Sequence, residues 1–441
     1  MTILDSLAQF VVGSNVTALP SEDLAIQRRH LGDVVIAALV GVHGEESRAV
    51  RPLFDASVAD RMAEMATVIR MTEIDDIHMP SCTTPHSAIA PVVLTLARAE
   101  PETARRALDA LRVGVDLMTR FGTAAKGPEI LYREIWPTYL AAPLSCAGAS
   151  ARMMGLTATQ TAHALAIALT LTAGGSGRFR QGLSPRWFMH GAAVRAGYMA
   201  ARAAKAGFFG DLGLLDRDWL EKTHGAALDT KILMDGLGSG SSYGALSIKP
   251  YCSAKQAIAA TEAFRKLLAG GLEVENIQSI VVRVPPAYAD MISGQASPQN
   301  RSTTFSSVRY QMALAAFHLD GLYDVCREQI VWSEKIVDLM GRISVERDET
   351  LSAHYPLRWP ATVAIQTKGA DAPLVRTELD AHGDPGARFD DAALLEKASR
   401  VLDPLVAAGA AAKWLADVND AVFDARKLPA LAAKLDQAIS I

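Results

Sequence analysis

The stretch DGLGSGSSYG, residues 235 to 244, separates two parts of the 441-residue chain that differ in character. Glycine-rich runs cost much conformational entropy to order, so they suit a boundary between domains. Apolar residues before the stretch recur at helical spacing, whereas alternation typical of strands appears after it. A chain of this length also exceeds what one simple core organises. The sequence therefore predicts two domains that meet near this stretch.

The part before the stretch is expected to consist of successive helices. Ser21 is placed to cap a helix whose first turn carries Glu22 and Asp23, since a hydroxyl oxygen can accept from free backbone N–H groups. Thr157 and Gln160 have the spacing of a capping box, which predicts another helix start.

The part after the stretch mixes strands and helices. Alternating apolar residues predict strands around 280–284 and 343–345, and a hairpin is expected from 363–365 and 374–379. Asp390 can cap a helix that starts at Ala392, and the chain then stays helical. The predicted fold is mainly α: a large all-helical domain formed by both chain ends (1–245 and 395–441) plus a smaller inserted α+β domain (246–394).

Composition narrows the class of protein. The formal net charge is −4, which gives little support to binding of nucleic acid or an acidic membrane. The most apolar stretch, residues 147 to 173, contains Arg152, Gln160 and His163, which favours a buried helix over a membrane span. Four cysteines without a CxxC spacing and a start without a basic region predict a reducing, cytoplasmic location with no zinc site.

The segment TEIDDIHMPSCTTPHSAIAP, residues 72 to 91, gathers acids and histidines before a predicted helix. Glu73, Asp75, Asp76, His78 and His86 supply the groups that acid–base chemistry on a carbon acid requires. The same residues also fit a capped helix start with surface acids.

Residues 174 to 197, GGSGRFRQGLSPRWFMHGAAVRAG, carry Arg178, Arg180 and Arg186 on a glycine-containing loop that leads into a helix. Guanidinium forks bind carboxylates through two hydrogen bonds, and a helix N-terminus adds positive potential. The alternative is a solvated loop with surface arginines.

Two further segments carry polar residues beside predicted helices. Lys249 and Tyr251 lie in SIKPYCSAKQAIAATEAF, residues 247 to 264, and could supply a cation and a hydroxyl; a domain-joining turn is the alternative. Tyr310 begins a predicted buried helix in residues 300 to 317, where its phenol needs a hydrogen-bond partner.

Taken in order, these segments resemble the MmgE/PrpD family, which includes 2-methylcitrate dehydratase, cis-aconitate decarboxylase and iminodisuccinate epimerase. EIDDIH resembles the family's DFDD segment, IKPYCSAKQAIAATEAF its KPYP segment, and FSSVRYQMALAAFHLDG the segment whose tyrosine borders the active site. LPSEDLAIQRRHLGDVVIAALVG resembles the N-terminal helix with its aspartate, here Asp33, and PTYLAAPLSCAGASARMMGL resembles the segment that ends in an alanine-rich helix. The resemblance spans almost the whole chain.

The resemblance implies a homodimer with a pocket between two domains and neither a metal nor an organic cofactor. It implies a lyase, a dehydratase or decarboxylase, that acts on a small di- or tricarboxylate through proton transfer next to a carboxylate. An epimerase of a dicarboxylate analogue and a non-catalytic small-acid-binding protein are the alternatives.

Carried over by position, Asp75, Asp76, Lys249 and Tyr310 match the family, and Glu73 stands where its pattern has an aspartate. The remaining positions depart from the family: its histidines fall at Thr83 or Thr84, at Trp136 and near Gln256, and its lysine falls at Arg186.

The resulting hypothesis gives each polar residue a role. His86 is the proton-transfer base, oriented by Asp75 or Asp76. Arg178, Arg180 and Arg186 bind substrate carboxylates, and Lys249, Tyr251 and Tyr310 orient the substrate and stabilise an enediolate-like intermediate.

Overall fold

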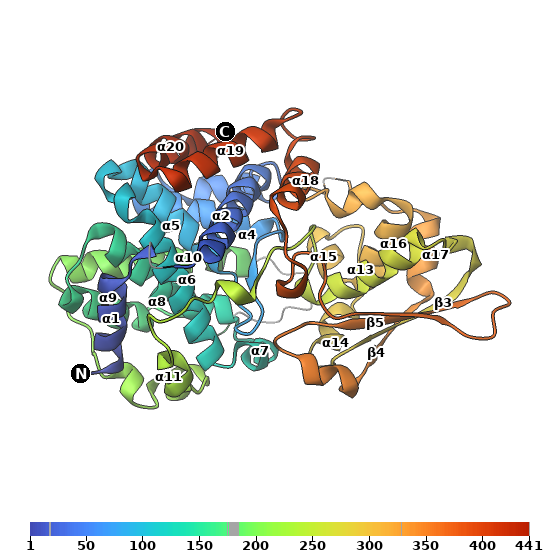
Figure 1. The fold of residues 1–441 in the computed structure, drawn as a ribbon, viewed down its shortest axis with the longest axis horizontal. Coiled ribbons are helices and arrows are strands. Elements are labelled where there is room, and N and C mark those ends of the chain that lie inside the picture. Colours follow the sequence, from blue (N-terminus) through green and yellow to red (C-terminus); the bar gives the residue numbers. More distant parts are fainter. Residues whose placement is uncertain (17–18, 174, 176–184, 328, 441) are drawn as a thin grey trace.

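The computed structural model describes residues 1–16, 19–173, 175, 185–327 and 329–440. Arg178 and Arg180, two of the predicted carboxylate-binding residues, lie outside the described residues. Figure 1 shows the chain as two parts side by side, one built from helices and one that contains the larger sheet. Both chain ends lie in the part built from helices. The prediction of a mainly α fold with a smaller inserted α+β region is confirmed; the exact domain boundaries stay a prediction.

The helical part is formed by both ends of the chain. Its α-helices are α1 (Ile3–Gly13), α2 (Ser21–Gly41), α3 (Ser47–Val50), α4 (Val58–Met71), α5 (Pro85–Ala99), α6 (Ala107–Ala124), α7 (Gly127–Ile130), α8 (Pro137–Met154), α9 (Ala158–Thr170), α10 (Pro185–Lys205), α11 (Trp219–His224), α12 (Thr230–Met234), α18 (Asp391–Leu402), α19 (Ala410–Phe423) and α20 (Leu428–Ile439). Helix α8 packs against α6 and α10, and α10 also packs against α4.

The mixed part contains the four-stranded sheet. Its helices are α13 (Lys255–Ala269), α14 (Pro286–Ile292), α15 (Arg301–Ser306), α16 (Val308–Phe317) and α17 (Glu334–Gly341). Its strands are β3 (Ile277–Val284), β4 (Ile343–Arg347), β5 (Ala361–Thr367) and β6 (Leu374–Glu378), in the order β4-β3-β5-β6. Helix α13 packs on β5 and β6, and α16 packs on α13 (Figure 1).

The strand predictions are confirmed, and the structure adds the topology. Strands β5 and β6 form the expected antiparallel hairpin, with Ala361 opposite Glu378. Strand β4 runs parallel to β3, because helices α14 to α17 connect the two strands and return the chain to the same end of the sheet. The side chain of Asp390 accepts from the backbone N–H of Ala393, which confirms its capping role, although α18 begins one residue before Ala392.

Two helix predictions need correction. Ser21 is the first residue of α2, and Pro20 occupies the cap position before it; the proline side chain has no hydrogen-bond acceptor, so no side chain caps this helix. The apolar stretch from 147 to 173 forms two helices, because Gly155 ends α8 in the left-handed region (φ 65°). The capping box of Thr157 and Gln160 then starts α9, as predicted. Across the described residues, no helix combines the length and apolarity that crossing a membrane requires.

A short sheet joins residues 72–91 to the connection between the two parts. Strand β1 (Ile77–His78) pairs antiparallel with β2 (Leu246–Ser247), with Ile77 opposite Ser247. Strand β2 directly follows the glycine- and serine-rich stretch, and Lys249 comes two residues after it. The pairing therefore brings the acid- and histidine-rich segment next to the lysine predicted to act with it.

Candidate active site

A pocket lies between the helical part and the mixed part. The helical part lines it with Arg70, Glu73, Ile77, Cys82, Thr84, Leu131, Trp136 and Arg186. The chain that leads into and forms the mixed part lines it with Lys249, Ala254, Lys255, Gln256, Met291, Ser302, Phe305 and Ser306. The cavity volume is about 50 Å³. That is room for roughly three to five water molecules, which suits a small ligand.

Glu73 is the centre of an ion-pair cluster in this pocket. Its Oε1 atom lies 2.7 Å from Nη2 of Arg186 and accepts from Nε1 of Trp187 at 3.1 Å. Its Oε2 atom accepts from Nη1 of Arg70 at 3.1 Å and lies 3.7 Å from Nζ of Lys249. The carboxylate is thus held by helices α4 and α10 and by the segment that enters the mixed part.

Local structure explains how these groups meet. Helix α4 ends at Met71 with Thr72 as its C-cap, and Glu73 follows with φ 57°, the left-handed conformation common one residue past the C-cap. Arg70 in the last turn therefore reaches Glu73 three residues later. Helix α10 approaches α4 closely at Gly191, where a Cβ would lie 2.2 Å from Oγ1 of Thr67. That close packing brings Arg186 and Trp187 over Glu73.

The cations control the charge of Glu73. Burial alone would raise the pKa of its carboxyl group, but Arg186, Arg70 and Lys249 together hold that pKa well below its usual range. Asp75 joins the same network, because its Oδ1 atom accepts from Arg70 at 2.8 Å and from Lys249 at 3.4 Å. Glu73 is therefore an ionised carboxylate that lines the pocket.

Lys255, a second buried lysine of the lining, is neutralised separately. Its Nζ atom lies 2.7 Å from Oδ1 of Asp384 and 2.8 Å from Oδ2. Both side chains are buried, so this pair is shielded from solvent.

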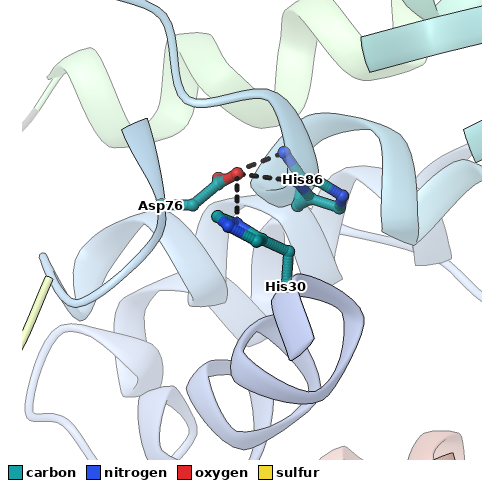
Figure 2. A group of neighbouring side chains, drawn as sticks. All are labelled: His30, Asp76 and His86. Carbon is teal, nitrogen blue, oxygen red and sulfur yellow. Dashed lines mark hydrogen bonds and ion pairs between the residues drawn. The ribbon is translucent and has the colours of Figure 1, made fainter. Parts of the chain in front are cut away.

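A second buried cluster contains His30, Asp76 and His86 (Figure 2). Oδ2 of Asp76 lies 2.7 Å from Nδ1 of His86 and 3.2 Å from Nδ1 of His30, and Oδ1 accepts from the backbone N–H of His86 at 3.1 Å. The two imidazole rings stack with centroids 4.9 Å apart. Burial lowers the pKa of His30 to about 4. The hydrogen bonds from both histidines to Asp76 fix His86 with Nδ1 toward the carboxylate.

His30, Asp76 and His86 are also candidate metal ligands. Among the described residues, one ligand atom from each of the three lies within 4.8 Å of the others. The 2.7 Å separation between Nδ1 of His86 and Asp76 is that of a hydrogen bond. Two ligands of a zinc ion at about 2 Å stand roughly 3.3 Å apart in tetrahedral geometry, so the cluster would have to open to take one. Hydrogen bonds, without a metal ion, account for the distances between Asp76 and the two histidines.

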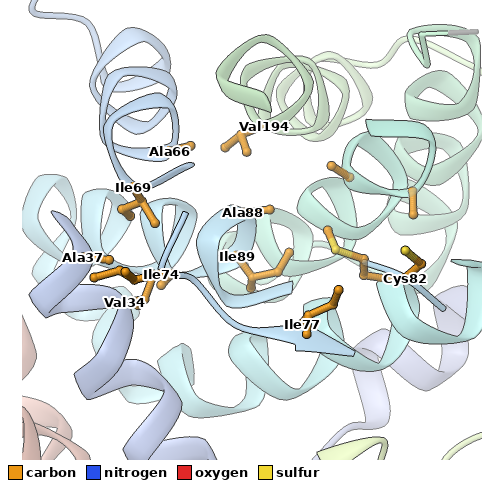
Figure 3. Packing of buried hydrophobic residues seen from close by; sticks show 14 of the residues in the cluster. Val34, Ala37, Ala66, Ile69, Ile74, Ile77, Cys82, Ala88, Ile89 and Val194 are labelled. Atoms are coloured by element: carbon orange, nitrogen blue, oxygen red, sulfur yellow. The ribbon is translucent and has the colours of Figure 1, made fainter. Parts of the chain in front are cut away.

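Two buried isoleucines anchor the segment that carries Asp75 and Asp76 to the core. Ile74 and Ile77 flank Asp75 and Asp76 and are buried, and Figure 3 shows Ile74 beside Val34. Because these apolar anchors hold the segment, the two adjacent aspartates point to different sides: Asp75 contacts Arg70 and Lys249, and Asp76 contacts the two histidines.

The structure brings some of the predicted site residues to the pocket and places others elsewhere. Arg186 and Lys249 line it, and Asp75 contacts Lys249 behind the lining. His86 is fully buried outside the lining, in contact with Asp76, one of the two residues predicted to orient it. His78 bonds to Ser81 instead (Nδ1 to Oγ, 2.8 Å).

The two predicted tyrosines also lie outside the lining. The Tyr310 hydroxyl donates to the carbonyl oxygen of Val331 at 3.0 Å, and its ring stacks on Trp332. Tyr251 is buried and packs edge-on against Tyr323, with ring centroids 6.0 Å apart. Both have contacts expected of core residues, and their predicted catalytic roles stay untested.

The positions at which the sequence departs from the expected family histidines do face the pocket. Thr84, Trp136 and Gln256 all belong to its lining. The guanidinium carbon of Arg186 lies 5.5 Å from the ring centre of Trp136, so the indole covers the arginine. Among the described residues that line the pocket, none is a histidine.

Two cations of the pocket, Arg70 and Lys255, were not predicted from the sequence. Arg70 precedes Glu73 by three residues, a spacing that predicts an ion pair at a helix end. Lys255 lies in the quoted segment around Lys249, but its partner Asp384 is 129 residues away, a separation that sequence reasoning does not bridge.

A second local signal marks the pocket. Besides Glu73, Cys82 adopts a positive φ (55°), and both side chains belong to the lining. Such conformations cost free energy in non-glycine residues and gather at functional sites. Burial raises the pKa of the Cys82 thiol to about 12, so this cysteine stays protonated.

Models of one known protein family match most of the chain. The model of the MmgE/PrpD N-terminal domain matches residues 55–224, and that of the MmgE/PrpD C-terminal domain matches residues 251–420. The matched ranges contain the pocket residues of both parts except Lys249. No curated protein matches the chain.

Proposed function

Because the chain belongs to the MmgE/PrpD family, which includes dehydratases, we propose that it is a lyase acting on a small carboxylic acid. In a dehydration, a proton leaves the carbon next to the carboxylate and the hydroxyl on the neighbouring carbon leaves as water; in a decarboxylation, CO₂ leaves and the resulting carbanion takes up a proton. Either reaction takes place in the pocket between the two parts. The resemblance implies a di- or tricarboxylate, and the charges that line the pocket determine how many carboxylates it accepts.

The observation that carries this proposal is the charge of the lining. Four cations, Arg70, Arg186, Lys249 and Lys255, line the space, and three carboxylates, Glu73, Asp75 and Asp384, contact them, so a net positive charge remains beside a largely buried volume. Buried cations that face an open volume bind anions strongly, because little water competes with the ligand. A carboxylate substrate is an anion that matches both guanidinium forks and ammonium groups, and it agrees with the family.

Two of the cations, Arg186 and Lys249, have distinct parts in the proposed chemistry. Arg186 is the more exposed of the two arginines, at 16% for its side chain, so it receives the substrate carboxylate. Lys249 supplies a positive charge beside the negative charge that develops when a proton leaves the neighbouring carbon. Arginine at position 186 acts as a clamp, because its guanidinium group keeps its proton throughout.

The proton acceptor stays a prediction. His86 is oriented by Asp76, as an activated base requires, and its Nε2 atom is buried without a hydrogen-bond partner among the described residues. Its ring is outside the lining, however, so it would need a change of conformation to reach a substrate. Ionised Glu73 lines the pocket, but its three cations make it a weak base.

A second candidate function is a binding protein for small acids without catalysis. It is favoured by one observation: the described lining residues include Thr84, Trp136 and Gln256 and no histidine. Such a lining retains the cations for binding and lacks the usual group for proton transfer.

Proton NMR in D₂O distinguishes the two functions. The purified protein is incubated with a panel of small carboxylic acids that differ in hydroxyl substitution and number of carboxylates. New alkene signals, loss of CO₂ or deuterium uptake support the lyase. Exchange at one carbon with inversion and no elimination would point to an epimerase. Ligand-induced thermal stabilisation with unchanged spectra would support the binding protein.

A further inference from the structure

Glu73 occupies the pocket in the way that a bound carboxylate ligand would. One oxygen contacts Arg186 and Trp187, and the other contacts Arg70 and Lys249. These donors come from both sides of the pocket, and together they satisfy both oxygens. We propose that the Glu73 carboxylate takes the place of one substrate carboxylate, so that this pocket selects acids with a single carboxylate. This inference rests on the proposed use of the pocket for carboxylic acids.

The backbone at Glu73 supports a dedicated role for the side chain. Residue 73 follows the end of α4 with φ 57°, a position where glycine is usual because a Cβ is disfavoured. The chain instead carries a long acidic side chain that is 3% exposed. The contacts with Arg186, Arg70 and Lys249 must offset both the strained backbone and the burial of a charge.

The charge balance of the described residues leads to the same conclusion. Asp384 contacts Lys255 through both oxygens and neutralises it. Glu73 and Asp75 share the other three cations of the lining, Arg70, Arg186 and Lys249.

Among the described residues, the four cations of the lining are therefore balanced by three carboxylates, and one positive charge is left over. A ligand with one carboxylate balances it, whereas a second carboxylate would place an unpaired negative charge in a small buried space. With glutamine at position 73, the lining would hold one more free positive charge and accept a second carboxylate.

The test compares binding of three unreactive acids with one, two and three carboxylates: propionate, succinate and tricarballylate. Isothermal titration at constant ionic strength measures each association constant for the unchanged protein and for Glu73→Gln. We expect the unchanged protein to bind propionate best. The ratio of succinate to propionate association constants should rise by about tenfold or more in Glu73→Gln, because a like-charge contact is removed and cations are released.

Glu64→Gln is the matched control, since Glu64 lies on α4, pairs with Arg61 at 3.0 Å and is outside the pocket lining. Its ratio should stay that of the unchanged protein. Glu73→Gly provides a second variant that removes the carboxylate and tolerates the left-handed backbone, in case the glutamine variant fails to fold.

An unchanged ratio in both Glu73 variants would overturn the inference, and so would a failure of all three acids to bind any of the proteins. A shifted ratio without turnover in the NMR assay would leave the inference intact and count only against the proposed reaction.

Discussion

Asp75 and Asp76 are neighbours in the chain and belong to two different buried clusters. Asp75 faces permanent cations, Arg70 and Lys249, next to the pocket. Asp76 faces His30 and His86, whose charge depends on protonation, in a closed region. The pocket cluster is built to hold negative charge, whereas the histidine cluster is a hydrogen-bonded core element that can carry a proton. One acidic segment therefore contains two kinds of site, and of these two only the pocket cluster opens to a ligand.

The largest expected effect compares the two aspartates directly. Asp75→Asn should lower the free energy of unfolding by about 3–5 kcal/mol, because it breaks a buried ion pair and leaves Arg70 and Lys249 dependent on Glu73. Asp76→Asn should cost only about 1–3 kcal/mol, since the amide oxygen can still accept from both histidines and the bond from the backbone N–H of His86 is lost. Urea denaturation at pH 7 measures both. Equal losses would contradict the distinction between a charged and a hydrogen-bonded cluster.

Lys249→Met tests the function of the pocket cluster. We expect turnover of any acid identified by NMR to fall by about 100- to 1,000-fold, because a cation beside the developing negative charge is lost. Lys266→Met is the control, since Lys266 is exposed and pairs with Glu378 away from the pocket. Turnover within twofold to threefold of the unchanged protein would remove Lys249 from the chemistry.

The histidine cluster should make the free energy of unfolding depend on pH. The pKa of His30 is about 4 in the folded protein, below its usual 6.5, so between these values the unfolded chain binds more protons. Stability should therefore fall as the pH drops from 6.5 toward 4, by at most roughly 3 kcal/mol from this group. His30→Asn keeps a hydrogen-bond donor near Nδ1 without titrating, so its stability should depend less on pH. Parallel curves for the two proteins would contradict this assignment.

The smallest expected effect concerns His86. Asparagine at this position keeps a donor to Asp76, so we expect His86→Asn to fold normally and retain turnover within about tenfold, as the place of the ring outside the lining implies. His86→Gln, which retains a polar group nearer to Nε2, is the companion variant. Loss of turnover in both folded variants would support the sequence-based role of His86 as the base.

Much of the fold followed from local patterns. The hairpin of β5 and β6, the capping box at Thr157 and the cap at Asp390 were predicted because each depends on residues close together in the chain. The parallel pairing of β3 with β4 needed the path of the intervening helices, which no local pattern contains. Ser21 was misassigned as a cap because Pro20 also fits the position before a helix.

The sequence predicted which segments form the candidate site, but it did not predict which side chains contact one another there. Arg186 and Lys249 were identified because arginine and lysine beside helix starts are typical anion ligands. The direction of each histidine was not predictable, since a shift of one residue turns a side chain to another side. Thr84 therefore faces the pocket, and His86, two residues later, faces Asp76.

The sequence by itself determined the helical and mixed parts, the family resemblance and the acidic segment at residues 72 to 91, because these depend on composition, spacing and residue order. Only the tertiary structure decided which acids meet cations and which meet histidines. Glu73 pairs with Arg186, 113 residues away, because α4 packs against α10. Lys255 pairs with Asp384, whose segment is held beside residues 247 and 248 by hydrogen bonds from Ser247 to Asp384 and from the Ile248 N–H to the Gly383 carbonyl oxygen. Electrostatic contacts depend on distance in space, and that distance is set by the packed core.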